Sequence, residues 1–458
     1  MFQAVDGAHG ALVGLHCWIP ENFDSAKWIM TTSVHGDLFG HPKGLFVLFF
    51  TEMWERFSYY GMRALLVYYM VKHLMLPHSQ ASQIYGLYTG LVYLTPLLGG
   101  ILADRVIGQR RAVIVGAFLM AIGHFMMAWE SLFFPALAFL ILGNGAFKPN
   151  ISTQVGSLYA AGDLRRDRAF SIFYVGINLG AFFSPLVCGT LGEMYGWHYG
   201  FAAAGVGMIT GLAIYLWGRR WLAPDVLGRE KRPPEGYPAL NRQEKGRLWG
   251  LAGICLISVA FWAAYEQQGN TIALWADTRT DRCLFGWEFP ASWFQALNPA
   301  FIFLLTPLIT ALWAKQSQRG TEPSTVKKMA IGCFLLGSGF LVMAPAAMIQ
   351  ASSDTRMHMA WLALFTLLVT IGELFLSPVG LSLVTKLAPS RMVSMMMGVW
   401  FLSSFGGNFL AGYLGHYWDL MAKDLFFIMI AAIALAAGFA ILLILKPLKR
   451  ALGPEQGL

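Results

Sequence analysis

The chain has 458 residues, of which 56% are hydrophobic and only 13% are charged, and its mean hydropathy is +0.54. Soluble domains carry about 25% charged residues, so this composition excludes a disordered chain, a disulfide scaffold and an ordinary soluble enzyme. The net charge of +8 does not indicate a nucleic-acid binder, because the basic residues lie in short segments between long apolar runs. These features predict a membrane protein.

Twelve segments are long and apolar enough to cross a hydrocarbon core of about 30 Å as helices. In chain order they are 44–72, 82–107, 111–130, 133–159, 168–194, 197–219, 247–276, 291–314, 327–350, 357–386, 391–418 and 425–446. With twelve spans, the N-terminus and every second loop lie on one side of the membrane. The loops on the other side contain only five of the 33 lysines and arginines, namely Lys72, Arg279, Arg282, Arg356 and Lys423. Because basic residues favour the cytoplasmic side, both termini are predicted to be cytoplasmic.

The longest polar stretch, 220–246, divides the spans into six and six. We therefore expect an all-α, polytopic protein with two six-helix bundles, 44–219 and 247–446, joined by a cytoplasmic linker. A transporter built from two pseudo-symmetric halves has this organisation and holds its substrate between them. Residues 1–43 lack the pattern of a signal peptide and are expected to form a disordered cytoplasmic segment, and 447–458 a cytoplasmic tail.

The first span contains six polar residues, five of them at offsets of three, four, seven, eight and eleven from the first. These offsets place all six on one face of a helix. They are Glu52, Glu55, Arg56, Tyr59, Tyr60 and Arg63. Charged residues inside a membrane are costly and usually mark a functional cavity. The alternative is that they only hold helices together, but two acids and two bases on one stripe favour a cavity.

Other charges also lie within spans. Lys148 stands beside Pro149, which is expected to break its helix, while Glu266 and Glu373 are lone acids in apolar runs of the second half. All the intramembrane cations thus belong to the first half, and the second half contributes only acids. One carboxylate lacks an internal partner and needs a proton or a substrate cation. This polarity favours a small zwitterion, such as a peptide with a free carboxylate and a free amine.

Polar and aromatic residues of other spans suit the same cavity. Tyrosine hydroxyls, asparagine amides and indole rings can bind a peptide's ends and line its walls. The candidates are Tyr59, Tyr60, Tyr93, Asn178, Asn298, Trp262 and Trp400. Taken singly, the aromatic residues are equally explained by packing or by a place at the membrane interface.

The segment between the second and third spans has glycines and charges at regular spacing. It contains Gly100, Asp104, Arg105, Gly108, Arg110 and Arg111. Asp104 is expected to pair with basic residues of a neighbouring helix and to lock one conformation of a transporter. The arginines alone are also explained as a cytoplasmic anchor.

No motif indicates an enzyme or a bound group. The five cysteines are scattered, and the chain has no His-Glu-x-x-His run, Gly-x-Ser-x-Gly elbow or Walker loop. We therefore expect no metal, no cofactor and no catalytic site. A peptide-sensing receptor and a transporter of amino acids or nitrate remain alternatives.

The motif from Glu52 to Gly61, Glu-Met-Trp-Glu-Arg-Phe-Ser-Tyr-Tyr-Gly, resembles the Glu-x-x-Glu-Arg-Phe-x-Tyr-Tyr motif of proton-dependent oligopeptide transporters. The 104–111 loop is similar to the signature loop of the major facilitator superfamily, to which these transporters belong. Supporting matches surround Lys148, Asn178, Glu266, Asn298 and Glu373. The resemblance implies the major facilitator fold and import of di- and tripeptides driven by the proton gradient.

The resemblance also implies roles for residues at matching positions. The peptide carboxylate would be bound by Arg56, Lys148, Tyr60 and Tyr93, and the amino terminus by Glu373, Asn178 and Asn298. Proton coupling would involve Glu266 with Arg63, and the pair Glu52 and Glu55. Tyr59, Trp262, Tyr265 and Trp400 would be pocket aromatics.

Three departures from the family refine the expectation. The linker has no apolar run for the two additional helices of many bacterial members, so this chain has twelve. Animal members carry a histidine where this chain has Gly86, so proton binding would rely on carboxylates. The loop 351–356 is too short for the extracellular domain of animal members. A monomer in a bacterial inner membrane is therefore expected.

Overall fold

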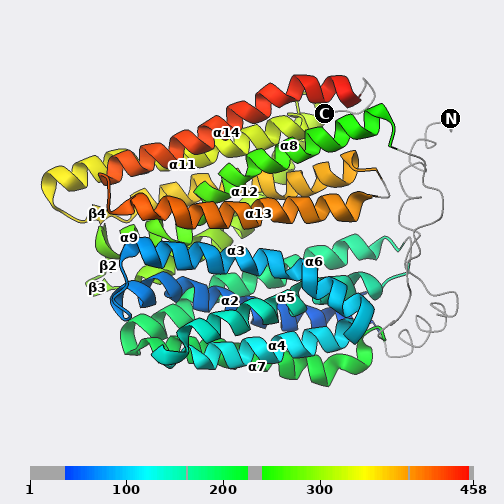
Figure 1. The fold of residues 1–458 in the computed structure, drawn as a ribbon, viewed down its shortest axis with the longest axis horizontal. Helices are drawn as coiled ribbons and strands as arrows, with labels where there is room; N and C mark the ends of the chain where they lie inside the picture. The colour runs from blue at the N-terminus through cyan, green and yellow to red at the C-terminus, as the bar shows by residue number, and fades with distance from the viewer. Residues whose placement is uncertain (1–36, 161–162, 225–239, 390–391, 453–458) are drawn as a thin grey trace.

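The structure is a computed structural model that describes residues 37–160, 163–224, 240–389 and 392–452 (Figure 1). Residues 1–36 of the expected N-terminal segment, most of the linker and the end of the C-terminal tail lie outside these ranges. Within them the chain is almost entirely helical, and each of the twelve expected spans corresponds to one helical segment.

The first half contains six long helices. They are α2 (Lys43–Lys72), α3 (His78–Leu102), α4 (Gln109–Met126), α5 (Phe133–Ser157), α6 (Arg165–Ser184) and α7 (Trp197–Gly218). Short helical turns extend or precede them: η2 (Ala103–Ile107), η3 (Glu130–Leu132), η4 (Pro185–Gly189), η5 (Leu191–Tyr195) and η6 (Arg219–Trp221). Helix α5 continues through Pro149 rather than breaking there, so the expectation of a break was wrong. Neighbouring helices allow such a proline inside a membrane helix.

The second half begins with α8 (Arg242–Tyr265), whose first turn is closed by a reciprocal capping box between Asn241 and Glu244. The remaining helical segments are η7 (Glu266–Gly269), α9 (Thr271–Thr278), η8 (Ala291–Ala296), α10 (Leu297–Gln318), α11 (Thr325–Ser353), α12 (Ala360–Leu387), α13 (Val393–Gly415), η10 (His416–Trp418) and α14 (Lys423–Leu452). The span expected at 247–276 is therefore α8, η7 and α9 in succession. It changes from α-helix to a 3-10 turn at Glu266 itself.

Four two-residue strands lie between the helices. β1 (Thr280–Asp281) pairs in parallel with β4 (Met357–His358), and β2 (Cys283–Leu284) forms an antiparallel hairpin with β3 (Trp287–Glu288). Phe285 and Gly286 have positive φ angles of 51° and 81° at the hairpin turn, as a tight hairpin requires. We call the end of the molecule that carries this hairpin the hairpin end, and the end where α7 stops and α8 begins the linker end.

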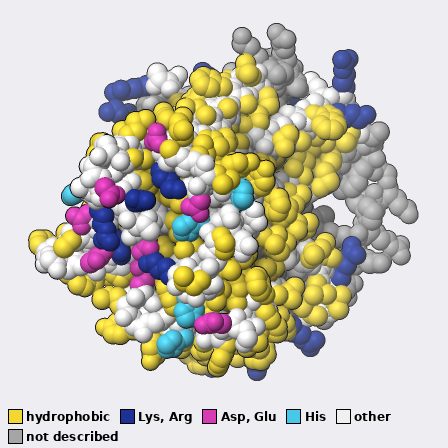
Figure 2. Space-filling view, turned by 60° about the vertical axis from the view of Figure 1, so that its left-hand side comes forward, with side chains coloured by type: hydrophobic (Ala, Val, Ile, Leu, Met, Phe, Trp, Pro, Cys, Tyr) yellow, Lys and Arg dark blue, Asp and Glu magenta, His cyan; other side chains and the backbone are white. Residues whose placement is uncertain are grey.

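Nine helical segments of the described chain are long and apolar enough to cross a membrane. Segments α2, α4 and α13 are not among the nine, and α2 carries the charged stripe predicted from the sequence. The flank of the molecule is mostly hydrophobic, whereas acidic, basic and histidine side chains gather at the hairpin end (Figure 2). This distribution is that of a multi-pass membrane protein with polar ends.

The two halves form two layers, with α2 to α7 in one and most of α8 to α14 in the other (Figure 1). They meet along α3 and α13 through close backbone contact. A Cβ atom added to Gly86 would lie 2.6 Å from the carbonyl oxygen of Asn408 and 2.6 Å from Cα of Gly412. Glycine at position 86 is therefore required by the approach of these two helices.

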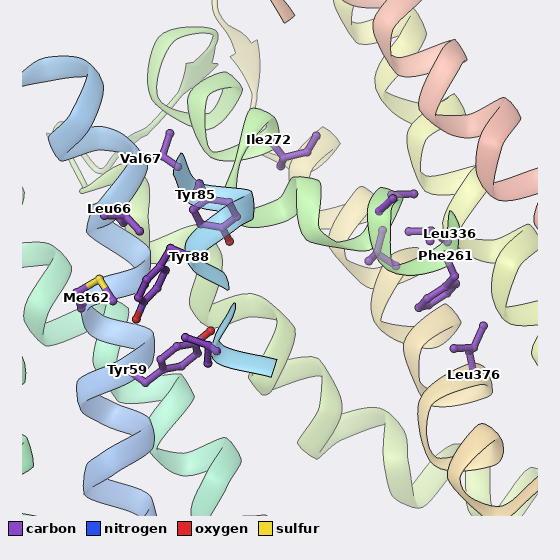
Figure 3. Close-up of a cluster of buried hydrophobic side chains, with 14 of the residues drawn as sticks. Tyr59, Met62, Leu66, Val67, Tyr85, Tyr88, Phe261, Ile272, Leu336 and Leu376 are labelled. Atoms are coloured by element: carbon purple, nitrogen blue, oxygen red, sulfur yellow. The ribbon is translucent and has the colours of Figure 1, made fainter. Parts of the chain in front are cut away.

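Buried apolar side chains fill each half. In the first half, Tyr59, Met62 and Leu66 of α2 and Tyr88 of α3 belong to one cluster (Figure 3). In the second half, α8 and α12 contribute side chains such as Phe261 to the same continuous core. This packing fixes the rotation of each helix and so decides which side chains face the space between the halves.

Candidate functional site

A cavity of about 260 Å³ lies between the two halves. Ten of the residues predicted from the sequence line it, four from the first half and six from the second. They are Tyr60, Arg63, Tyr93, Asn178, Trp262, Tyr265, Glu266, Asn298, Glu373 and Trp400. The volume is slightly below the ~300–1,000 Å³ usual for ligand pockets, which indicates a small ligand.

Arg63 of α2 and Glu266 of η7 form an ion pair across the two halves at this cavity. The guanidinium Nε also donates a hydrogen bond to the hydroxyl of Tyr85 on α3, at 2.7 Å. The Glu266 side chain is 2% exposed. A buried ion pair of this kind is stable only while both partners stay charged, because removing one charge leaves the other uncompensated.

Glu52, Glu55 and Arg56 form a second buried cluster, about two to three helical turns from Arg63 along α2. Arg56 Nε lies 3.0 Å from Glu52 Oε1, and Arg56 also forms an ion pair with Glu55. Asn144 of α5 donates a hydrogen bond of 3.2 Å to Glu55. None of Glu52, Glu55 and Arg56 is among the residues lining the cavity. The charge of Arg56 is therefore engaged by two acids of its own helix.

Glu373 of α12 is held by neutral donors. The hydroxyl of Tyr265 donates to Glu373 Oε2 at 2.8 Å, and Nδ2 of Asn298 donates to the same oxygen at 2.9 Å. Asn298 also contacts Thr370 Oγ1 at 3.1 Å. Among the described residues, no hydrogen bond to the second carboxylate oxygen is found. That oxygen is left for a ligand in the cavity that Glu373 lines.

Lys148 of α5 is not among the residues that line the cavity, but it contacts Tyr93, which is. Its Nζ is 4.3 Å from the centroid of the Tyr93 ring, a cation–π contact with a residue that lines the cavity. Neither Lys148 nor Glu373 pairs with an oppositely charged side chain within the part of the chain that the structure describes. Among the described charges predicted within the membrane spans, Lys148 of the first half and Glu373 of the second half thus have no ion-pair partner.

The remaining predicted residues differ in their placement. Asn178 lines the cavity and donates to the Tyr174 carbonyl oxygen of its own helix at 3.0 Å. Tyr59 is 5% exposed and is not among the lining residues; its ring lies 5.5 Å from Cζ of Arg56. Tyr59 therefore packs against the charged cluster of α2, whereas Trp262, Tyr265 and Trp400 form aromatic walls.

The signature loop departs from expectation at Asp104. In the described chain Asp104 forms no ion pair in this conformation; it accepts a hydrogen bond of 3.4 Å from Gln109. The expected lock therefore stays a prediction for another conformation. Gly108, at φ 86°, separates η2 from α4 and redirects the chain. Arg110 instead donates to the carbonyl oxygen of Leu222, after η6. Gly100 lies in α3 beside Pro149. Within the described ranges, neither Arg105 nor Arg111 forms an ion pair with an acidic side chain.

Sequence reasoning missed two residues at the centre of the site. Tyr85 contacts Arg63 as described above, and its place eight residues before Tyr93 puts both on one face of α3. Asn408 of α13 is fully buried beside the α3–α13 contact, and its Nδ2 donates to the carbonyl oxygen of Ser404 at 2.9 Å. Its only sequence signal is a polar residue after the pair Gly406–Gly407 in an apolar run.

Polar contacts between the halves cluster from the Arg63–Glu266 pair to the hairpin end. One of them is an ion pair of 2.6 Å between Lys72 Nζ and Asp277 Oδ1. Other hydrogen bonds join α2, α3 and η5 to the second half, among them Tyr68 with Ala273, Ser82 with Asn270, His78 with Asp419, and Glu193 with Ala291 and Ser292. The halves are thus fastened together at the hairpin end.

Comparisons with known proteins agree with this geometry. A family model described as the POT family matches residues 110–231 and 239–434. The chain is 36% identical to the peptide transporter YePEPT of Yersinia enterocolitica, over 92% of this chain and 97% of that one. It is 35% identical to a di-/tripeptide transporter of Lactococcus lactis subsp. cremoris, with coverages of 91% and 97%. A crystal structure of a peptide transporter POT in complex with sulfate superposes with a TM-score of 0.85, at 34% identity over 93% and 99% of the two chains.

Proposed function

The chain belongs to the POT family, and from that membership and the charges of its cavity we propose that it is a proton-coupled symporter importing di- and tripeptides by alternating access. It is a membrane transporter of the major facilitator fold and not an enzyme. The observation that carries the substrate proposal is the pair of opposite charges, Lys148 and Glu373, which lack ion-pair partners among the described residues and belong to opposite halves.

A small peptide with free ends matches this pair. Its carboxylate would bind the cations of the first half, Lys148 and Arg56, with help from Tyr60 and Tyr93. Lys148 is the better placed of the two in this conformation, because two glutamates engage Arg56. A charge-assisted hydrogen bond to the carboxylate would also fix the peptide's orientation.

The peptide's amino terminus would bind at Glu373. The oxygen Oε2 is occupied by Tyr265 and Asn298, so the ammonium group would take the other oxygen. Asn298 and Asn178 provide amide oxygens on the same cavity wall. A bound zwitterion would then bridge the halves, since its ends contact α5 on one side and α12 on the other.

Proton coupling would operate at the Arg63–Glu266 pair. A proton arriving at Glu266 removes the negative charge, so Arg63 loses its partner and the contact between the halves weakens. Glu52 and Glu55, which share Arg56, form a second carboxylate pair that would take part in coupling. The gradient supplies the energy, and no cofactor is required.

The halves are fastened at the hairpin end, and we assign that end to the outside and the linker end to the cytoplasm. The positive-inside distribution of lysine and arginine supports this orientation. The protein would then be a monomeric, multi-pass protein of a bacterial inner membrane with both termini cytoplasmic. The two bundles, 44–219 and 247–446, would rock about the α3–α13 contact, joined by the 220–246 linker.

The proposal is tested by uptake of labelled di-alanine into proteoliposomes that contain the purified protein. With an inward proton gradient, uptake should exceed that without a gradient, and unlabelled di- and tri-alanine should compete. Competition by alanine or nitrate but not by di-alanine would instead indicate a transporter of those solutes. Peptide binding without uptake would indicate a receptor and would contradict the proposal.

A further inference from the structure

Asn144 of α5 is a buried amide that contacts the charged cluster of α2. The residue is 1% exposed, and its Nδ2 donates to Oε1 of Glu55 at 3.2 Å. Among the described residues, Oδ1 of Asn144 has no hydrogen-bond partner. The bond to Glu55 is therefore the side-chain contact that this amide makes, and it joins two helices of the first half.

Helices α2 and α5 pass each other in opposite directions. Towards the hairpin end, the ring centroids of Tyr69 in α2 and Phe133 in α5 are 5.8 Å apart. Towards the linker end, a Cβ atom on Gly44 in α2 would lie 2.8 Å from Leu158, the residue after α5. Positions later in α5 therefore lie beside positions earlier in α2.

Lys148 lies level with the buried acids of α2. It follows Asn144 by four residues, so it is on the same face of α5 and about one turn, or 5.4 Å, nearer the linker end. On the antiparallel α2, that turn leads from Glu55 towards Glu52. Together with Arg56 these two acids leave one negative charge in excess, which attracts an ammonium group. Nevertheless, no ion pair joins Lys148 to an acid of the described chain, and its Nζ lies against a tyrosine ring of the cavity wall.

The contacts of Glu55 explain why the lysine stays unpaired. Oε1 accepts from Asn144, and Oε2 forms an ion pair with Arg56. A donor on each oxygen fixes the carboxylate, so neither oxygen is left to turn towards Lys148. An amide suits this place because it donates without carrying a charge, whereas an acid there would itself attract the lysine.

We propose that Asn144 is a positioning residue for substrate binding, whose amide holds Glu55 and thereby keeps Lys148 available for the peptide carboxylate. The inference rests on the proposed function, in which Lys148 binds that carboxylate. Without the amide, Oε1 of Glu55 is a buried acceptor that has lost its donor, which is costly. Lys148, one turn along the same face, then replaces the amide as the donor, and its charge is no longer free for a ligand.

The test measures the preference for a free carboxylate, defined as the Kd of di-alanine amide divided by the Kd of di-alanine. Both constants are measured by calorimetry on purified full-length protein. Asn144→Leu removes the donor at similar side-chain size, and its combination with Glu55→Gln also removes the acid that would capture Lys148. Asn150→Leu is the matched control, because Asn150 is 2% exposed on the same helix and donates to the Ala146 carbonyl oxygen of that helix.

For Asn144→Leu we expect the preference to fall about tenfold or more, because the peptide carboxylate then meets a lysine that an acid already engages. Adding Glu55→Gln should restore the preference to that of Glu55→Gln alone, since a neutral glutamine cannot capture Lys148. Asn150→Leu should keep the preference of the unmodified protein. A mere loss of packing in Asn144→Leu would instead weaken both ligands equally, and Glu55→Gln would not repair it.

An unchanged preference in Asn144→Leu, or a lowered preference that Glu55→Gln does not restore, would overturn the inference. If Asn144→Leu does not fold, Asn144→Ala, which cannot overpack the site, decides by the same two criteria. Lys148→Ala tests the proposed function separately. If it leaves the preference unchanged, the carboxylate assignment of Lys148 is rejected and the inference with it. A lowered preference in Lys148→Ala beside an unchanged one in Asn144→Leu rejects the inference alone.

Discussion

The carboxylate of Glu193 in η5 accepts two backbone hydrogen bonds from the opposite half. Oε1 accepts the N–H of Ser292 at 2.9 Å, and Oε2 accepts the N–H of Ala291 at 2.9 Å. It therefore satisfies two of the unpaired N–H groups at the start of η8, in the opposite half. Thr190 Oγ1 adds a hydrogen bond of 2.9 Å from Nε1 of Trp293. A side chain of one half thus caps the N-terminus of a helical turn in the other half.

Replacing Glu193 with alanine should open the hairpin end. Two charge-assisted hydrogen bonds are lost, each worth about 1.5–3 kcal/mol, so the population opened at that end should rise. Spin labels on α6 and α10 would report this as a longer-distance peak. Glu130→Ala is the control, because Glu130 pairs with His73 within the first half. An unchanged distance distribution in Glu193→Ala would show that the cap does not hold the halves together.

Lys148→Ala should weaken binding of a dipeptide far more than binding of its C-terminal amide. The lysine has no ion-pair partner among the described residues, so its role would be to meet a carboxylate that the amide lacks. Loss of such a contact costs about 2–5 kcal/mol. Competition assays with di-alanine and di-alanine amide measure the difference. Equal losses for the two ligands would contradict the carboxylate assignment.

Glu266→Gln should abolish accumulation against a gradient and leave counterflow intact. Glutamine is permanently neutral, so Arg63 loses its ion-pair partner and no proton can be loaded or released. Glu373→Gln is the contrasting variant, since it should weaken binding of the peptide amine in both assays. Uphill accumulation of di-alanine by the Glu266→Gln protein would show that coupling lies elsewhere.

Peptides with uncharged side chains should be preferred. The charged residues that line the cavity in the described chain are Arg63, Glu266 and Glu373, and all three are engaged by other residues or by the proposed amine. A further charge on the ligand would enter an apolar, aromatic space without a partner. Competition by alanyl-alanine should exceed that by lysyl-alanine or aspartyl-alanine about tenfold or more. Equal potency would contradict this preference.

Glu322 outside the membrane should stabilise the second half in a pH-dependent way. Its hydrogen bond from Lys328, whose Nζ lies 3.9 Å from the centroid of the Trp313 ring, lowers the pKa of the Glu322 carboxyl. A lowered pKa means that the contribution is present above the ordinary value of 4.5 and is lost as pH falls through the lowered value. Glu322→Gln should therefore reduce stability by about 1 kcal/mol or less at pH 7 and have less effect in acid, as thermal unfolding in detergent can measure. If the stability difference between Glu322→Gln and the unmodified protein did not depend on pH, it would not come from the Glu322–Lys328 ion pair.

The sequence by itself determined the twelve helices and the location of the charged stripe. A membrane helix needs a run of about 20 apolar residues, and a charge within such a run is costly enough to stand out. Glu266, Glu373 and Lys148 were found in this way from local pattern alone. The offsets from Glu52 to Arg63 likewise follow from helical periodicity and required no tertiary contact.

Only the tertiary structure decided which of these charges meet. Arg56 and Arg63 lie on the same face of α2. Arg56 contacts glutamates of its own helix, whereas Arg63 contacts Glu266 of the second half, because η7 lies beside α2 at the height of Arg63. The same is true of Asn408, which is buried against α3 because Gly86 allows α13 to approach. Periodicity fixes directions within one helix, whereas the relative height and rotation of two bundles come from packing between residues hundreds of positions apart in the chain.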